Sequence, residues 1–214
     1  MKIIGISQRV ELFSKFLERR DSLDQNWSSL FESIGLNLVP IPNGLKNLRV
    51  WVKNQRLEGI LLSGGNDLSA YCKSNNAAPE RDTTEIELLN IAIESNLSVL
   101  GVCRGMQMIN HFLGGNIIPV DRHTNTNHLL KINTKLNTFK IFSKVNSFHN
   151  WGIRLSDLAD DLEPLLLAED ETVEAFRHKF KPWYGIMWHP ERSQINGPSS
   201  DMVLLSKIFK QTKK

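Results

Sequence analysis

The sequence predicts an α/β fold built on a doubly wound, mostly parallel sheet, and two observations support this prediction. In the N-terminal half, short apolar runs alternate with segments of helical periodicity, a rhythm typical of parallel β-α-β units. Further along, the apolar run 98–102 leads directly into Gly-x-Cys-x-Gly and a helical segment. This is the layout of a nucleophile elbow at the carboxyl end of a parallel strand.

The individual elements follow from periodicity and turn residues. Apolar runs predict strands over residues 2–6, 36–39, 59–62 and 98–102. Helical spacing predicts helices over 22–34, 45–54, 81–95 and 106–113. Beyond Gly115 we expect an α+β half, antiparallel in part, with strands over 116–120, 128–132, 138–141, 172–177 and 183–188, and a closing helix over 200–211.

Length, composition and charge restrict the class of protein. With 214 residues, 41% of them hydrophobic, and neither an internal repeat nor a linker, we expect one domain over residues 1–214. Lys and Arg number 26 against 23 Asp and Glu, a net charge of +3 that is too small for a dedicated nucleic-acid binder. Small acidic substrates remain open, and the basic run 207–214 is interpreted as a solvated helix end.

The cysteine count and the N-terminus predict a cytoplasmic protein. Cys72 and Cys103, the two cysteines, occur in unrelated contexts, so neither a disulfide framework nor a four-ligand zinc site is indicated. The first residues are typical of a strand rather than a signal peptide, and no apolar stretch approaches the roughly 18 residues that span a bilayer. We therefore expect no membrane association.

The elbow makes Cys103 the candidate nucleophile. Its two flanking glycines allow a sharp turn from strand to helix that leaves the side chain exposed to substrate. A free thiol has a pKa of about 8.5, which a helix N-terminus and a nearby histidine can lower. The competing interpretation is a buried, inert cysteine, which is the commoner fate of a free thiol.

A base for this nucleophile is predicted in the sequence Trp-His-Pro-Glu. His189 follows an apolar strand, and the proline after it halts the strand and holds a turn. That turn allows Glu191 to reach the imidazole ring, fix its tautomer and stabilise its charged form. Taken alone, His189 would be an ordinary surface histidine; together with the elbow it completes a Cys-His-Glu triad.

An oxyanion hole is expected at the turn formed by residues 63–67, which follows the strand 59–62. One donor is expected to be the backbone N–H of Arg104, and the other that of Gly64 or Gly65, between which the sequence does not decide. The alternative is a plain tight turn.

The three motifs, in this order, make the chain resemble the class I glutamine amidotransferase-like family, and within it the free-standing γ-glutamyl hydrolase branch of the peptidase C26 type. The most specific matches are residues 101–107 and 187–191, and further matches lie at 79–82, 114–115, 145–149 and 173–175. The resemblance implies a flavodoxin-like sheet and a small-molecule γ-glutamyl substrate. It also implies that the glutamyl group is bound by the following residues: Gln107, Phe148, His149, Asn150 and Trp151.

Within that branch, the resemblance favours hydrolysis and a nucleotide-linked substrate. Glutaminase subunits usually have a bulky apolar residue after the cysteine, whereas this chain has Arg104. A diphosphate would need nearby cations, and the candidates are Arg9, Arg19, Arg20 and Arg104. We predict Arg20 as a substrate-binding residue, because residues 19–20 should lie in a loop over the ligand edge of the sheet. The alternative, that Arg20 is an ordinary solvated surface charge, fits the sequence equally well.

Three other functions are compatible with the sequence. The chain could be a glutaminase subunit that supplies ammonia to a partner synthetase, although no synthetase domain is fused to it. It could hydrolyse γ-glutamyl polyamines, or it could be a binding protein that has kept the fold without activity. No cofactor is expected. His123, His128 and His149 suggest a metal site, but their uneven spacing and the lack of an accompanying carboxylate lead us to expect no metal.

Overall fold

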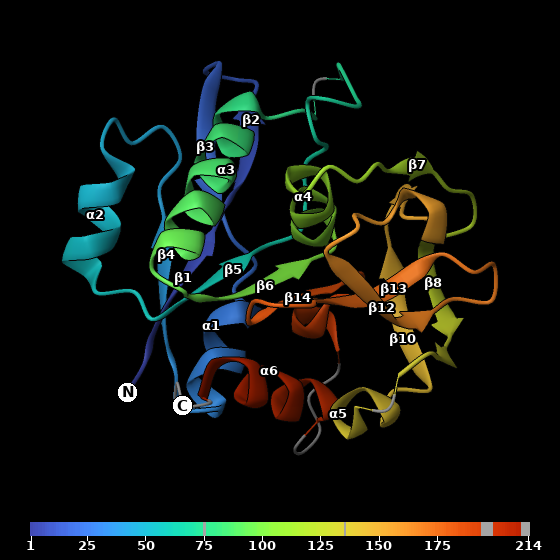
Figure 1. The fold of residues 1–214 in the computed structure, drawn as a ribbon. Helices are drawn as coiled ribbons and strands as arrows, with labels where there is room; N and C mark the ends of the chain where they lie inside the picture. Colours follow the sequence, from blue (N-terminus) through green and yellow to red (C-terminus); the bar gives the residue numbers. More distant parts are fainter. Residues whose placement is uncertain (75, 135, 194–198, 211–214) are drawn as a thin grey trace.

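The computed structural model describes residues 1–74, 76–134, 136–193 and 199–210, and within these a mixed sheet of eight strands forms the centre (Figure 1). The first five strands in spatial order are parallel and the last three run antiparallel to their neighbours. In spatial order the strands are β4 (Asn37–Ile41), β1 (Ile3–Ser7), β5 (Gly59–Leu62), β6 (Ser98–Val102), β14 (Trp183–Ile186), β13 (Val173–His178), β12 (Leu162–Leu167) and β9 (Lys131–Ile132).

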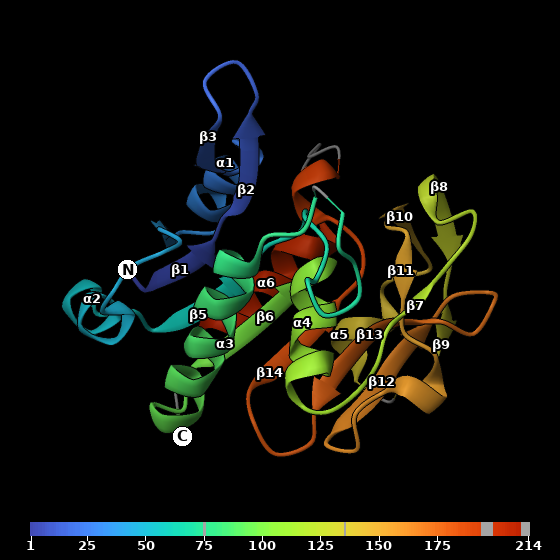
Figure 2. The same ribbon diagram turned by 90° about the horizontal axis from the view of Figure 1, so that it is seen from above.

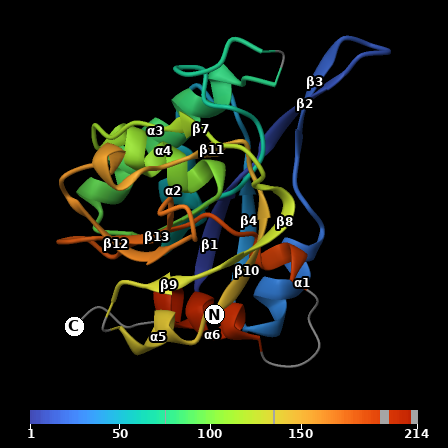
Figure 3. The same ribbon diagram turned by 90° about the vertical axis from the view of Figure 1, so that its right-hand side faces the viewer.

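Helices cover both faces of this sheet, which makes three layers (Figures 1 and 3). One face packs against α2 (Leu48–Gln55), α3 (Pro79–Glu94) and α4 (Arg104–Phe112), and the other against α1 (Asn26–Ser33), α5 (Asn137–Lys140) and α6 (Ser200–Lys210). Each face has its own apolar core. The predicted doubly wound α/β class is therefore confirmed. Among the described residues, no helix has the length and apolar character needed to cross a membrane.

Three small two-stranded sheets surround the central one. The hairpin of β2 (Arg9–Phe13) and β3 (Glu18–Ser22) projects from the body (Figure 2), and β8 (Thr124–Leu129) pairs with β10 (Lys144–Phe148). The third pair is β7 (Ile118–Pro119) with β11 (Trp151–Gly152). Single 3-10 turns occur at Leu155–Asp157 and Pro190–Arg192.

Two sequence predictions about local structure are wrong. The segment 138–141, expected as a strand, forms the last three residues of helix α5 and its C-cap, because the helical turn buries Phe139 against Phe142 and Tyr184. The segment between the predicted strand 2–6 and the predicted helix 22–34, expected as a loop, contains the β2–β3 hairpin. The side chains of the hairpin are largely exposed and so lack an alternating apolar pattern. Strands β10 and β12 were not predicted, and β12 contains Pro164 at an irregular register. The end of the predicted closing helix, Gln211, lies outside the described residues.

The core beneath the sheet gives a stability prediction. Phe31 is fully buried between Trp27 and Phe209, so Phe31→Ala should lower the free energy of unfolding by about 3–5 kcal/mol in a urea titration. Phe180→Ala is the matched control, because its ring is 80% exposed, and its effect should stay within about 0.5 kcal/mol. Equal effects of the two substitutions would contradict this assignment of the core.

Candidate active site

The backbone at Cys103 has the strained geometry of a nucleophile elbow. The residue links β6 to α4 with φ of 51° and ψ of −107°, a conformation that non-glycine residues rarely adopt and that costs of order 1–3 kcal/mol. The chain packs so closely around this turn that the positions two residues before and two residues after Cys103 must be glycine. A Cβ at Gly101 would lie 2.5 Å from the backbone of Gly105, and one at Gly105 would collide with the carbonyl of Leu62.

Sheet topology brings His189 to this cysteine. β14 is the parallel neighbour of β6, with Ile186 opposite Val102, so the residues after both strands emerge at the same edge. Nδ1 of His189 lies 2.7 Å from Oε1 of Glu191, which leaves Nε2 for the thiol. Asn146 on β10 fixes the backbone of the histidine: its amide accepts from the N–H of His189 and donates to the carbonyl, both at 2.9 Å.

The electrostatics of the site favour a thiolate and an imidazolium. Burial by itself would raise the pKa of the Cys103 thiol, but the charge and hydrogen bond of His189, with His149 and the N–H of Arg104, bring that pKa below its usual value. Burial likewise opposes charging of His189, yet the thiolate and Glu191 raise the pKa of His189 to about 9. Both pKa changes act in the same direction, towards a thiolate on Cys103 and an imidazolium on His189.

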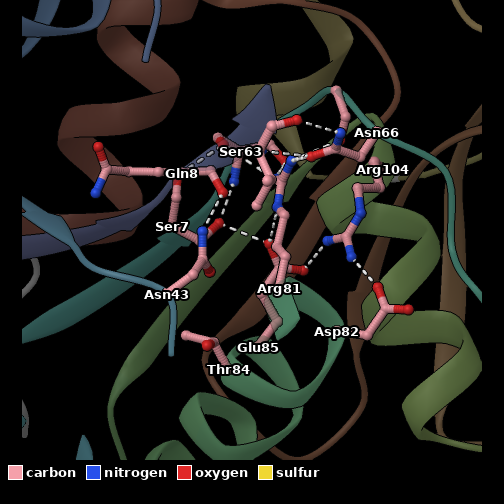
Figure 4. Close-up of polar contacts among 12 residues, drawn as sticks. Ser7, Gln8, Asn43, Ser63, Asn66, Arg81, Asp82, Thr84, Glu85 and Arg104 are labelled. Atoms are coloured by element: carbon pink, nitrogen blue, oxygen red, sulfur yellow. Dashed lines mark hydrogen bonds and ion pairs between the residues drawn. The ribbon is translucent and has the colours of Figure 1, made fainter. Parts of the chain in front are cut away.

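The turn after β5 lies directly against these two side chains. A Cβ at Gly64 would lie 2.6 Å from Cε1 of His189 and 3.5 Å from Cβ of Cys103. Gly65 adopts φ of +83° and packs under the guanidinium of Arg9. Arg81 donates to the carbonyls of Ser63, Gly64 and Gly65 at 2.6, 3.1 and 2.5 Å (Figure 4). Because N–H and C=O point in opposite directions across a trans peptide, this directs the amides of Gly64 and Gly65 away from Arg81.

A buried network of charges holds Arg81 in place (Figure 4). Arg81 pairs with Glu85 at 2.9 Å, and Arg104 pairs with both Glu85 and Asp82. Arg81, Glu85 and Arg104 are at most 1% exposed. The side chain of Arg104 is thus committed to these carboxylates, so its prediction as a diphosphate ligand is wrong, while its backbone N–H remains beside the thiol.

A cleft of about 280 Å³ opens beside His189 and Glu191. It carries charges of both signs: Arg9 and Arg192 line it together with Glu11 and Asp24. Its remaining lining residues are Ser22, Leu23, Trp27, Ser63 and Gly64. The cleft is thus suited to a substrate that carries both ammonium and anionic groups. A larger cavity of about 610 Å³ between α2 and α3 contains none of the predicted site residues.

Arg20 does not line this cleft, so its prediction as a substrate ligand has no support from the geometry. Its guanidinium pairs with Glu18 at 2.6 Å and lies over the ring of Phe13 on the β2–β3 hairpin. Neighbouring Arg19 pairs with Glu80. The two arginines were predicted to form a loop over the ligand edge, but the hairpin carries them away from the cleft.

Gln107 and the segment 148–151 meet next to the thiol. The Gln107 amide donates to the carbonyl of Trp151 at 2.8 Å, which leaves its oxygen available for a ligand. The ring of Phe148 stands edge-on to His189, with 6.0 Å between centroids. His149 is buried, whereas Asn150 is exposed and accepts a hydrogen bond from Thr124.

The three histidines considered as metal ligands lie together, and a carboxylate accompanies them. His123, His128 and His149 surround Glu174, and all four are buried. The premise that no carboxylate accompanies these histidines is therefore wrong. Sequence reasoning also gave no role to Arg81, Glu85 or Asn146; the only signal was that Arg81 and Asn146 fall within the motifs that match the family.

Comparisons with known proteins agree with this fold. Residues 2–191 match the family model of Peptidase C26. The chain is 37% identical over 202 residues to the gamma-glutamyl-CDP-amidate hydrolase of Campylobacter jejuni, with 94% of each chain covered. It is 36% identical over 151 residues to a subunit of the glutamine-hydrolysing GMP synthase of Methanococcus vannielii, which covers 69% of this chain and 71% of the relative.

A solved structure from Thermoplasma acidophilum, of a protein described as a GMP synthase subunit, has the same fold. The TM-score is 0.71 at 19% identity, with 98% of this chain and 92% of the other covered. Fold and site geometry thus define an α/β protein of the class I glutamine amidotransferase type. Within that class, the chain belongs to the peptidase C26 family, and it is a hydrolase of amide C–N bonds.

The lowered pKa of Cys103 and the raised pKa of His189 predict how the reactivity of the thiol depends on pH. In a Cys72→Ser background, which leaves one thiol, Cys103 should be alkylated rapidly by iodoacetamide even at pH 7, because a lowered pKa preserves the thiolate below the ordinary value of about 8.5. His189→Ala should slow alkylation at pH 7 about tenfold and move the midpoint of the profile upward.

His111→Ala is the matched control, since His111 contacts Tyr71 instead of the site, and it should leave the profile unchanged. A midpoint near 8.5 in both the parent and His189→Ala would contradict the ion pair.

Proposed function

We propose that this chain is a cysteine-dependent γ-glutamyl hydrolase that converts γ-glutamyl-CDP-amidate to glutamate and cytidine diphosphoramidate, as a step in the biosynthesis of capsule phosphoramidate. The observation that carries the proposal is the convergence of Cys103, His189 and Glu191 at one edge of the sheet, in a chain 37% identical over nearly its whole length to a hydrolase of that name.

The first chemical step is attack by the Cys103 thiolate on the δ-carbonyl carbon of the glutamyl group. A C–S bond forms, and the negative charge moves to the carbonyl oxygen, which accepts from the N–H of Arg104 and from Gly64 or Gly65. The charge then returns, the C–N bond breaks, and Nε2 of His189 gives its proton to the leaving nitrogen. Glu191 stabilises the imidazolium until that transfer.

The second step releases glutamate from the thioester. Neutral His189 accepts a proton from a water molecule while the oxygen of that water attacks the carbonyl carbon of the thioester. The C–S bond then breaks, which restores the thiolate of Cys103 and leaves His189 as an imidazolium. No external reductant, oxidant or metal enters this balance. Gln107 and residues 148–151, which lie beside the thiol, are proposed to bind the glutamyl group.

The charges around the cleft support a nucleotide-linked leaving group. Arg9 and Arg192 line the cleft with partly exposed guanidinium groups, and arginine matches the geometry of phosphate oxygens. Glu11 and Asp24 could pair with the ammonium group of a glutamyl moiety. We propose Arg9 and Arg192, in place of Arg20 and Arg104, as the diphosphate ligands.

Two further assignments accompany the function. We propose that residues 1–214 act as one catalytic domain, because the nucleophile and its base come from the two halves of the chain. We also propose a cytoplasmic location, since both cysteines are free and cytosolic thiols are kept reduced. A glutaminase subunit that supplies ammonia to a synthetase is the second candidate, favoured by the relative from Methanococcus vannielii.

The direct test is glutamate release by the purified protein from separate substrates: γ-glutamyl-CDP-amidate, glutamine, γ-glutamyl-putrescine and γ-glutamyl peptides. We expect the nucleotide substrate to give the highest kcat/KM. Cys103→Ala should lower kcat at least about 10³-fold, because the covalent route is lost, whereas Cys72→Ala should retain activity.

Each other outcome has a definite meaning. Preference for γ-glutamyl-putrescine would assign the chain to polyamine hydrolysis, and release from glutamine only after addition of a synthetase would establish the glutaminase. Equal glutamate release by Cys103→Ala and wild type would show that the triad is not catalytic.

Arg81 is expected to act as a positioning residue for the oxyanion donors. Arg81→Lys keeps the charge beside Glu85 but cannot reach all three carbonyls, so kcat for glutamate release should fall about 10²-fold, as when an oxyanion donor is lost. The alkylation rate of Cys103 at pH 7 should change little, because His189 is untouched. Arg49→Lys, a surface substitution on α2, is the control. Parallel loss of alkylation and turnover would indicate general unfolding instead.

A further inference from the structure

Four buried side chains in the C-terminal half converge from separate elements of the fold. His123 precedes β8, His128 lies on β8, His149 follows β10, and Glu174 lies on β13 of the central sheet. They are 5%, 8%, 4% and 0% exposed. One ligand atom from each lies within 4.8 Å of all the others. We propose that these four residues bind a structural Zn²⁺ ion.

Three polar atoms of this cluster have no hydrogen-bond partner, although they are buried. They are Nδ1 of His123, Nε2 of His149 and Oε2 of Glu174. A buried polar atom without a partner costs about 1–3 kcal/mol, and the triad does not use any of these three. A cation bound between these imidazoles and the carboxylate of Glu174 would give the two unpaired histidine nitrogens a partner.

The outer hydrogen bonds of two histidines direct their free nitrogens into the cluster. Nε2 of His123 lies 2.9 Å from Oδ2 of Asp170, and Nδ1 of His149 lies 2.9 Å from the carbonyl of Trp151. When these nitrogens carry the protons, the opposite nitrogens present lone pairs. Histidine ligands of metals are held in this way, by a carboxylate or a backbone carbonyl on the distal nitrogen.

The spacing is close to that of a four-coordinate ion. Two ligand atoms at tetrahedral positions 2.0–2.1 Å from zinc are about 3.3 Å apart. Oε1 of Glu174 lies 2.9 Å from Nδ1 of His128 and 3.7 Å from Nε2 of His149, values on either side of that separation. Since no pair of ligand atoms is more than 4.8 Å apart, zinc binding requires any pair to close by at most about 1.5 Å.

The ligand set selects the metal and its role. Three imidazoles and one carboxylate suit Zn²⁺ better than Mg²⁺ or Ca²⁺, which prefer oxygen ligands. Four protein ligands leave no open position for water, so the ion is structural. It would fasten the β8–β10 sheet to β13 and thereby hold Phe148–Trp151 beside the thiol. In Figure 2 these strands lie together at one side of the molecule.

The test measures zinc binding without reference to turnover. Because a thiolate can bind zinc by itself, the parent protein carries Cys103→Ala, which prevents zinc from binding at the nucleophile. After removal of metal by chelation, titration with ZnCl₂ and desalting, elemental analysis should give about one equivalent of zinc. Zinc at 100 times Kd should raise Tm by about 5–10 °C. Co²⁺ in its place should give the intense visible absorption of a four-coordinate ion.

Variants test which residues hold the ion. His123→Ala should abolish the bound equivalent. Asp170→Ala should weaken zinc binding about 10- to 100-fold; its side chain is 49% exposed, so folding is not at risk. His111→Ala, a histidine outside the cluster, should bind zinc like the parent. Less than about 0.1 equivalent in the parent, or equal binding by parent, His123→Ala and Asp170→Ala, would overturn the proposal. Either result leaves the γ-glutamyl hydrolase assignment untouched.

Discussion

The buried ion-pair network of Arg81, Glu85, Arg104 and Asp82 is the constraint on which the site depends. Its two cations and two anions balance, so little net charge is left in the interior. Ser7 on β1 joins it through a 2.7 Å hydrogen bond to Glu85. Removal of one partner from such a network typically costs about 3–5 kcal/mol, because the others stay buried and unpaired. The glycine turn, the elbow helix and α3 are therefore held as one unit.

The groups around His189 stabilise its imidazolium form. The ring stands between the thiol of Cys103 and the carboxylate of Glu191, and both raise its pKa. Its backbone is clamped by Asn146, and Gly64 packs against its edge. A side chain at Gly64 would displace the imidazole of His189. The turn after β5 can therefore pack this closely against His189 only because glycine has no Cβ. Preorganisation of this kind lets donors stabilise developing charge without rearrangement.

The sequence predicts best what depends on local order. Strands 59–62 and 98–102 have the observed bounds because each is a continuous apolar run that ends in a glycine-containing turn. The two motifs of the triad are equally local, since Cys103 lies in the elbow and His189 and Glu191 are two residues apart. Their meeting depends instead on the pairing of β6 with β14. The histidine cluster could not be predicted, because it requires the pairing of β8 with β10 and their contact with β13.

Three of the four arginines predicted as diphosphate ligands lie outside the cleft for a related physical reason. Arg19 and Arg20 follow the first strand as closely as loop residues of a doubly wound fold would, but the chain pairs with itself as a hairpin and directs them outward. The side chain of Arg104 points into the ion-pair network because a helix begins at that residue and α3 supplies carboxylates. Both outcomes depend on partners distant in sequence, which periodicity does not reveal.

The position of β14 has a consequence for biosynthesis. This strand is inserted between β6 and β13, and it is the last strand of the sheet to leave the ribosome. Until Trp183–Ile186 has been added, the nascent chain contains its nucleophile but neither the imidazole that activates it nor the strand that supports the elbow. Without His189, the Cys103 thiol lacks the main group that lowers its pKa. Activation of the nucleophile therefore belongs to the completed sheet and not to the elbow alone.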